Sequence, residues 1–211
     1  MTRLTTDCGG ITVSYTDDLD GGGQDFGKQY LPFVRDQFPD AAAVLEWCSG
    51  PGFIGFSLLG HGLCESLALA DINPDAISAC DDTITRNNLA NTATAYLSDC
   101  FESIPAHRAW DLIVGNPPHV NTTPPGETEF QRHKPQVIYL DQDWAIHRRF
   151  YAQARRHLAP GGSVVLQEKY RFARPEVFFP MIESGGLRVH EVVTCPPPHE
   201  EYYFLWSRPA A

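Results

Sequence analysis

The sequence predicts an α/β protein with a Rossmann-like, doubly wound sheet of seven strands, mostly parallel and with an antiparallel C-terminal strand. Two observations lead to this prediction. From residue 43 onward, short apolar runs alternate with longer amphipathic stretches, which is typical of strands and helices that cover both faces of a parallel sheet. Near the C-terminus, two strand-like runs follow each other with no room for a crossover helix, so we expect antiparallel neighbours.

Few elements are expected before residue 43. Gly10–Tyr15 has the pattern of a short strand, Gly21–Gly23 that of a hinge, and Gln29–Phe38 that of a helix. This stretch is too small for a separate substrate domain. We therefore expect residues 1–42 to form an N-terminal cover over the core.

The core is expected to begin at residue 43 and to alternate strands with helices. We expect strands over 43–46, 66–71, 95–97, 112–114, 163–167, 187–194 and 202–207, and helices over 54–59, 76–89 and 144–158. A chain of 211 residues is long enough for one well-filled core and short for two, so a single domain over 1–211 is predicted, with 43–211 as its core. In such sheets the ligand site lies at the carboxyl ends of the strands.

Composition narrows the class of protein. The residues are 43% hydrophobic and 11% aromatic, as in globular proteins, and the longest apolar stretches fall short of the roughly 18 residues that span a bilayer. The N-terminus has no basic segment followed by an apolar one, so we expect a soluble, cytoplasmic protein. The six cysteines form no C-x-x-C pair and the eight histidines have no zinc spacing, which favours free thiols and no metal site.

The charge balance argues against nucleic acid as a partner. A formal charge of −10 and a pI near 5.1 mean that a phosphate backbone meets net repulsion. One basic patch with a helical repeat stands out, and we interpret it as a solvated helix face: His147, Arg148, Arg149, Arg155, Arg156 and His157.

A glycine-rich segment follows the first core strand. "VLEWCSGPGFIG" places Gly50, Gly52 and Gly55 as G-x-G-x-x-G between a strand and a helix, where a ligand can approach the backbone. Asp71 ends the next apolar run, 21 positions after Gly50, where an acid can accept from both ribose hydroxyls. The pattern fits either a nicotinamide cofactor or S-adenosylmethionine, and the alternative is a turn with a chance acid.

Two further acids favour S-adenosylmethionine. Asp99, in "YLSDCF", follows the third core strand and can accept from an adenine amino group, although it can equally be a helix N-cap. Glu46 precedes the glycine loop, near the expected place of a methionine ammonium.

The segment "DLIVGNPPHVN" ends a buried strand in an unusual way. Proline lacks an N–H and holds the residue before it extended, so the exit offers carbonyl oxygens and few donors. The side-chain oxygen of Asn116 and the carbonyl of Pro117 are then two acceptors at one spot, suited to both hydrogens of a planar –NH2 group. The alternative is that Asn-Pro only terminates the strand.

Three segments are expected to border the substrate. Residues 120–141 form a long connection that we interpret as a substrate lid, with a disordered insertion as the alternative. The N-terminal Gln24, Phe26 and Tyr30 are expected to cover the cofactor. The C-terminal "CPPPHEEYYFLWS" places Tyr202 near the substrate side, or in a packed aromatic strand.

Together these motifs resemble the class I S-adenosylmethionine-dependent methyltransferases of the "methyltransferase small domain" type, which include glutamine-amide and amino-group N-methyltransferases. The resemblance covers about residues 43–168, through "VLEWCSGPGFIG", "ADINPDAI", "LSDCF", "WDLIVGNPPH" and "HLAPGGSVVLQE". It implies that Asn116, Pro117 and His119 are catalytic and that Pro118 joins them at the substrate, while Tyr202 is expected there from the C-terminal segment. It implies cofactor contacts from Gln24, Phe26, Glu46, Cys48, Gly50, Gly52, Gly55, Asp71, Ile72, Asn73, Asp99, Cys100 and Asn116.

The sequence departs from the family pattern at three points. Cys48 replaces the first loop glycine, which is tolerated if the backbone there is ordinary. His119 stands where an aromatic residue usually stacks on the target, and histidine can stack or act as a base. The N-terminal helical substrate domain of the release-factor enzymes is missing, so we expect a different acceptor.

The sequence therefore predicts an enzyme that moves a methyl group from S-adenosylmethionine, leaving S-adenosylhomocysteine, to a nitrogen of a protein side chain or small molecule. The alternatives are an amino group of an RNA base, or an oxygen with His119 as base. A cofactor-binding regulatory protein without turnover is disfavoured by the intact Asn116-Pro117-Pro118. A nicotinamide oxidoreductase is disfavoured because no catalytic Tyr/Lys pair or second domain is evident.

Overall fold

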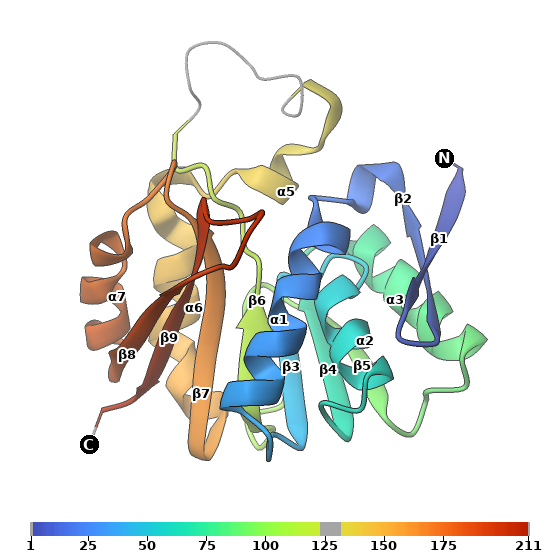
Figure 1. Cartoon of the computed structure of the whole chain (residues 1–211), viewed down its shortest axis with the longest axis horizontal. Coiled ribbons are helices and arrows are strands. Elements are labelled where there is room, and N and C mark those ends of the chain that lie inside the picture. The colour runs from blue at the N-terminus through green and yellow to red at the C-terminus, as the bar shows by residue number, and fades with distance from the viewer. Residues whose placement is uncertain (1, 123–131, 211) are drawn as a thin grey trace.

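The computed structural model describes residues 2–122 and 132–210, and within them the chain builds one central sheet of seven strands (Figure 1). The strands lie in the order β5-β4-β3-β6-β7-β9-β8. Their bounds are β3 Ala43–Trp47, β4 Ser66–Asp71, β5 Ala93–Leu97, β6 Trp110–Gly115, β7 Leu158–Lys169, β8 Leu187–Thr194 and β9 Tyr202–Pro209.

The pairing of these strands confirms the predicted fold class. β3 pairs in parallel with β4 and β6, β4 with β5, and β6 with β7. β9 is antiparallel to both β7 and β8, so the two C-terminal strands are the antiparallel neighbours expected from the short segment between them. β7 is longer than the predicted 163–167, because it begins as soon as the preceding helical turn ends.

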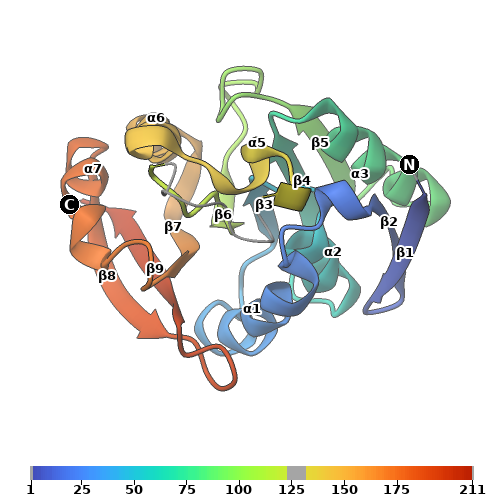
Figure 2. The ribbon, with the colours of Figure 1, turned by 90° about the horizontal axis from the view of Figure 1, so that it is seen from above.

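Helices cover both faces of the sheet, and this explains the unbroken apolar strands. One face packs against α1 Gly23–Gln37, α2 Phe53–Gly60 and α3 Pro74–Arg86, and the other against α6 Ala145–Ala154 and α7 Phe179–Ser184. In β6, Leu112 and Val114 face the first group and Ile113 the second, and all three are fully buried. Figure 2 shows α1 and α2 on one side of the sheet and α6 on the other.

The N-terminal segment forms a hairpin that the sequence only half revealed. The predicted strand at 10–15 is β2 Ile11–Thr16, but it pairs with a second strand, β1 Arg3–Cys8, which was missed. β1 is mostly polar and largely exposed, so it lacks an apolar signal. The side chains of α3 hold β2, since the Ser14 N–H donates to Thr83 Oγ1 at 2.9 Å and the Thr12 N–H to Asn87 Oδ1 at 3.0 Å.

Helix α1 begins earlier than predicted, and the glycines are its start rather than a hinge. Gly22 is the N-cap with φ 97°, a left-handed conformation that suits glycine. Further along, the expectation that Tyr30 covers a cofactor is wrong. Tyr30 is fully buried and donates its hydroxyl to the carbonyl of Gly115 at 2.7 Å, so it anchors α1 beneath the end of β6.

The basic patch is not a single solvated face. His147 is fully buried and His157 is 7% exposed, because both rings point toward the aromatic core under α6. Arg149 pairs with Asp99 at 3.1 Å. In the part of the chain that the structure describes, none of the helices combines the length and apolar character that crossing a bilayer requires.

Candidate active-site pocket

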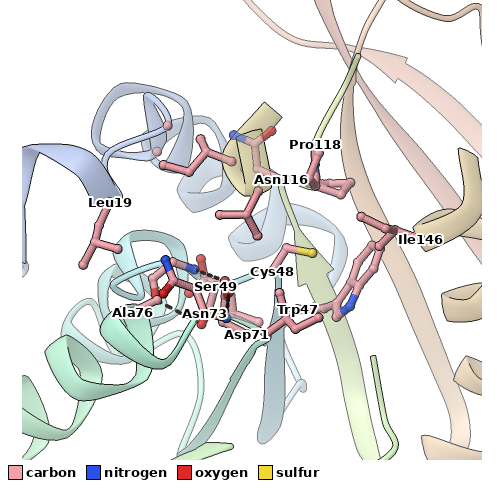
Figure 3. A pocket seen from close by; sticks show the side chains of 18 of the residues that line it. Leu19, Trp47, Cys48, Ser49, Asp71, Asn73, Ala76, Asn116, Pro118 and Ile146 are labelled. Atoms are coloured by element: carbon pink, nitrogen blue, oxygen red, sulfur yellow. Dashed lines mark hydrogen bonds between the residues drawn. The ribbon is translucent and has the colours of Figure 1, made fainter. Parts of the chain in front are cut away.

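A pocket opens where β3, β4 and β6 end, at the edge that the topology predicts (Figure 3). Many of the predicted site residues line it, namely Glu46, Cys48, Gly50, Asp71, Ile72, Asn73, Asp99, Cys100, Asn116, Pro117, Pro118 and His119. Four predicted residues lie outside its lining: Gln24, Gly52, Gly55 and Tyr202. The side chain of Phe26 lies outside the described part of the chain.

The glycines of the G-x-G-x-x-G segment differ in what they do. Gly50 has φ 50° and lines the pocket with its backbone. A Cβ on Gly52 would lie 2.7 Å from the ring of Phe56, and one on Gly55 would lie 2.7 Å from Leu67 and 2.8 Å from Glu46 Oε2. Gly52 and Gly55 therefore serve the packing of α2 onto the sheet rather than the pocket surface.

The backbone at Cys48, where the cysteine replaces a glycine, does not meet the condition of an ordinary conformation. Its φ is 51°, in the left-handed region that costs a residue with a Cβ about 1–2 kcal/mol. The conformation follows the tight turn from β3 into the glycine loop, and it turns the Cys48 side chain into the pocket wall (Figure 3). Cys100, also in the wall, has φ 49°.

Asp71 ties together the two loops that frame one side of the pocket. Its Oδ2 accepts from the Gly50 N–H and its Oδ1 from the Asn73 N–H, both at 2.8 Å. Burial raises the pKa of Asp71, and these backbone hydrogen bonds partly oppose the rise. Asn73 in turn caps α3, since its Oδ1 accepts from the Asp75 N–H at 3.0 Å and Pro74 opens the helix.

Glu46, in β3, is a buried residue of the pocket lining that contacts the first turn of α2. Its Oε2 accepts from the Gly55 N–H at 2.6 Å and its Oε1 from the Ile54 N–H at 3.4 Å. These N–H groups belong to the first turn of α2 and would otherwise lack a helical acceptor. Burial raises the pKa of Glu46 from 4.5 to about 8, despite the two hydrogen bonds.

Gln24 turns away from the pocket for a local reason. Its Nε2 donates to Asp20 Oδ2 at 3.0 Å, while Asp20 Oδ1 accepts from the Gly22 N–H at 2.8 Å. The side chain thereby closes the turn before α1. Its predicted contact with a cofactor has no support in this arrangement.

Asn116 stands across the pocket from Asp71, at the end of β6 (Figure 3). Its Oδ1 is buried and has no hydrogen-bond partner among the residues that the structure describes. A buried acceptor without a partner costs about 1–3 kcal/mol, so its presence calls for an explanation. Because Asn116 lines the pocket, a bound donor is the simplest one.

His119, at the end of the same motif, begins a buried polar network. Its Nδ1 lies 3.2 Å from Glu168 Oε2, and the other Glu168 oxygen lies 2.8 Å from His147 Nε2. His147 Nδ1 lies 2.6 Å from Asp141 Oδ2. Glu168, His147 and Asp141 are almost fully buried. Tyr202 does not reach the pocket, but its ring lies against His119, with centroids 5.9 Å apart.

The described ends of the predicted lid approach the N-terminal cover. Val120 pairs with Leu140, and the short helix α5 Gln136–Tyr139 puts Val137 and Ile138 into the pocket wall. Figure 1 shows α5 above the ends of the central strands. Lys134 Nζ lies 3.1 Å from Asp17 Oδ2 in the cover. Residues 123–131 of the lid lie outside the described residues, and a lid role for 120–141 stays a prediction.

Sequence reasoning missed several residues of the pocket and of the buried network. Leu19, Trp47, Ser49, Phe53, Ala76, Ser98, Val137, Ile138, Ile146 and Arg149 line the pocket, and Asp141, His147 and Glu168 form the network with His119. Ser49 and Ser98 could have been found, because they stand beside predicted residues at the strand ends. The apolar residues of the pocket could not have been found, because an apolar residue in a sequence looks the same whether it lines a pocket or packs in the core.

Comparisons with known proteins agree with this arrangement. The model of the family "Methyltransferase small domain" matches residues 22–130. The chain is 25% identical over 143 residues to a ribosomal protein uL3 glutamine methyltransferase of Francisella tularensis subsp. tularensis, covering 66% of this chain and 45% of the relative. It is 27% identical over 163 residues to the Bordetella pertussis protein of that name, covering 76% and 54%. The chain spans about half the length of these curated relatives.

Solved structures support the fold. The crystal structure of a TehB-like SAM-dependent methyltransferase from Corynebacterium glutamicum superposes with a TM-score of 0.61 at 18% identity, covering 87% of this chain and 88% of that one. The CcbJ methyltransferase from Streptomyces caelestis gives 0.64 at 14% identity, covering 88% and 90%. At these identities the likeness concerns the fold alone.

Proposed function

The chain belongs to the methyltransferase small domain family, and we propose that it transfers a methyl group from S-adenosylmethionine to a nitrogen of a protein side chain or small molecule. Membership confirms the resemblance seen in the sequence. The names of the curated relatives, glutamine methyltransferases that act on a ribosomal protein or a release factor, support a nitrogen on a protein as the acceptor. A cytoplasmic location is part of the proposal, since six free cysteines suit a reducing compartment.

The arrangement of the pocket supports the proposal that S-adenosylmethionine binds there. Asp71 ends β4 with a carboxylate at the pocket, where it would accept from ribose hydroxyls. Glu46 and the backbone of Gly50 would face the methionine end, and Asp99 the adenine. Arg149 already holds one oxygen of Asp99, so an adenine amino group would use the other.

The observation that supports methyl transfer to a nitrogen is the Oδ1 of Asn116, which has no hydrogen-bond partner among the described residues. It lies in the same pocket as the glycine loop, on the opposite side from Asp71 (Figure 3). A nitrogen that donates to this oxygen and to the carbonyl of Pro117 would be held with its remaining face toward the cofactor. Such positioning lowers the barrier because it removes rotational freedom before the reaction.

The test of this function has two parts. S-adenosylhomocysteine should bind and raise the melting temperature, whereas NAD and NADP should not. Labelled S-adenosylmethionine incubated with cell extract should then yield a product with the label on nitrogen. Binding of a nicotinamide cofactor instead, or label in RNA that ribonuclease removes, would contradict the proposal.

Asp71→Ala should weaken S-adenosylhomocysteine binding by about 1.5–3 kcal/mol. The change removes a charged acceptor for two hydroxyls, and it also releases the Gly50 and Asn73 N–H groups. Calorimetry on wild type, Asp71→Ala and the matched Asp71→Asn measures the loss, which should be smaller for asparagine because one acceptor oxygen remains. Unchanged affinity in the alanine variant would remove Asp71 from the site.

Binding of S-adenosylhomocysteine should release a proton near pH 7. The pKa of Glu46 is raised to about 8, so the carboxyl is largely protonated in the free protein. A cationic methionine ammonium beside it favours the ionised form, so affinity should rise with pH up to about 8, by at most about tenfold per pH unit. Calorimetry in two buffers of different ionisation enthalpy counts the protons. In Glu46→Gln the release should vanish, and proton uptake by the wild type would contradict the assignment.

A further inference from the structure

We propose that His119 is the general base of the reaction, that Glu168, His147 and Asp141 position and charge it, and that the acceptor is therefore a basic amine rather than a carboxamide. This inference rests on the proposed function. It names the class of acceptor nitrogen, which the pocket residues alone leave open.

The four side chains form one continuous series of hydrogen bonds that starts at the pocket. His119 lies in the pocket wall with its side chain 15% exposed, and its Nδ1 lies 3.2 Å from Glu168 Oε2. The series continues from Glu168 Oε1 to His147 Nε2 at 2.8 Å, and from His147 Nδ1 to Asp141 Oδ2 at 2.6 Å. It ends on backbone, since Asp141 Oδ1 accepts from the Ile146 N–H at 2.7 Å.

The series fixes which nitrogen of His119 carries its proton. The ionised Glu168 only accepts, so the Nδ1 of His119 donates to it and Nε2 is left with a free lone pair. Neighbouring rings limit rotation of the imidazole. Phe172 lies nearly parallel to it, with centroids 6.5 Å apart, and Tyr202 packs edgewise at 5.9 Å. This tautomer is the one that a general base at the pocket requires.

The buried charges add up to a net negative group behind His119. Burial alone lowers the pKa of His147, but Glu168 and Asp141 outweigh it and raise that pKa to about 9, so His147 is a cation. Burial alone raises the pKa of Glu168, but His147 and His119 outweigh it and hold that pKa below its ordinary value. Two carboxylates and one imidazolium leave one negative charge behind His119, on the side of its Nδ1.

This charge selects the type of acceptor. An aliphatic amine is a cation at neutral pH and has no lone pair until a proton leaves. A carboxamide needs no base before attack, because its nitrogen sheds a proton to water once it is methylated. A neutral histidine in the pocket wall, backed by this negative group, therefore suits the amine in both charge and chemistry.

The reaction balances with the groups present. A proton passes from the acceptor nitrogen to His119 Nε2, and the nitrogen lone pair forms a bond to the methyl carbon. The sulfur–carbon bond of the cofactor breaks, and its electron pair stays on sulfur. The proton leaves His119 to solvent after the product departs.

The first experiment needs no acceptor. Nitrogen NMR of the histidine-labelled full chain with S-adenosylhomocysteine should show His119 as the Nδ1–H tautomer, with the signal assigned from His119→Phe. Glu168→Gln should change that tautomer, since the glutamine can donate as well as accept. A wild-type His119 with its proton on Nε2 would overturn the inference, whether or not the Glu168 variant folds.

The second experiment identifies the labelled nitrogen after reaction with extract and S-adenosylmethionine. Label in an amine supports the inference. Label in a glutamine or asparagine amide, or on oxygen, with normal S-adenosylhomocysteine binding contradicts this inference alone. Absence of cofactor binding or of any label contradicts the proposed function, and this inference with it.

The third experiment uses as methyl acceptor the extract fraction in which the second experiment found the label, prepared from unreacted extract. His119→Phe keeps a ring but should lower the rate by about 10²–10⁴, with S-adenosylhomocysteine affinity within a few-fold. The matched control His157→Phe, a buried histidine that bonds the Arg108 carbonyl, should change neither. An unchanged rate in His119→Phe would contradict the base role.

The pH profile separates a base from a packing residue. Within residues 2–122 and 132–210, the titratable side chains that contact His119 are those of Glu168 and Tyr202. Around Tyr202 lie Lys169, His199 and Glu201. The wild-type rate should rise with pH and then level off, whereas the rate of His119→Phe should keep rising as the free amine forms in solution. Parallel profiles for the two proteins would overturn the inference.

Discussion

His147→Ala is expected to lower the free energy of unfolding by about 3–5 kcal/mol. The change removes the cation between two buried carboxylates, Asp141 and Glu168, and leaves them to face each other without a counter-charge. It also removes a ring that packs against Trp47, Trp144 and Phe178. Urea unfolding of wild type and variant at pH 6.5 measures the difference.

The same residue makes stability depend on pH in a defined direction. The pKa of His147 is about 9 when folded and 6.5 in the unfolded chain, so its contribution is complete below pH 6.5 and is lost as pH rises through 9. The folded pKa of Glu168 lies below 4.5, so its contribution is complete above pH 4.5 and is lost as pH falls below that value. Glu46 acts in the same direction as His147, since its pKa is about 8 when folded and 4.5 in the unfolded chain. Wild-type stability should therefore be highest near pH 4.5 and fall as pH rises toward 9.

A matched control separates the network from a general effect of losing a histidine. His107 is exposed in the loop before β6, so His107→Ala should change the free energy of unfolding by less than about 0.5 kcal/mol and leave its pH dependence intact. In His147→Ala the part of the alkaline fall that comes from His147, between pH 6.5 and 9, should be absent, while the part that comes from Glu46 remains. A His147→Ala protein as stable as the control would mean that the buried groups are not charged as described.

Local pattern was sufficient for the sheet because its signals are strong and short-range. Leu112, Ile113 and Val114 form an apolar run between Asp111 and Gly115, and such runs separated by helices predict parallel pairing. Strand β1 was missed because it is exposed and makes its contacts through the hairpin rather than through an apolar face.

The candidate site was partly predictable for a related reason. Asp71, Asp99 and Asn116 each end a recognisable strand, and parallel strands bring their carboxyl ends to one edge. The network behind His119 joins a loop, a helix and a strand that are far apart in the sequence, so no spacing reveals it. The left-handed backbone of Cys48 was also beyond the sequence, because a cysteine gives no signal of positive φ.

Asn116→Ala is expected to lower turnover by about 10²–10³ while cofactor affinity stays within a few-fold. Asn116 lines the pocket and its buried Oδ1 has no partner among the described residues, so it can take a donor without first breaking another bond. Alanine removes that acceptor and leaves Asp71 and the glycine loop unchanged. Steady-state kinetics with the acceptor identified by labelling measure turnover, and calorimetry with S-adenosylhomocysteine measures cofactor affinity.

Two matched variants test whether the acceptor oxygen itself is what counts. Asn116→Asp keeps an oxygen at this position and should be milder than alanine, because a carboxylate still accepts from the substrate nitrogen. Asn116→Leu keeps the size but offers no acceptor, so it should be as slow as alanine. If leucine matched the wild type, Asn116 would act only by filling space, and full activity in Asn116→Ala would reduce the Asn116-Pro117-Pro118 segment to a strand terminator. If turnover falls while the affinity for S-adenosylhomocysteine stays the same, Asn116 acts in the step in which the substrate nitrogen is held against the methyl group.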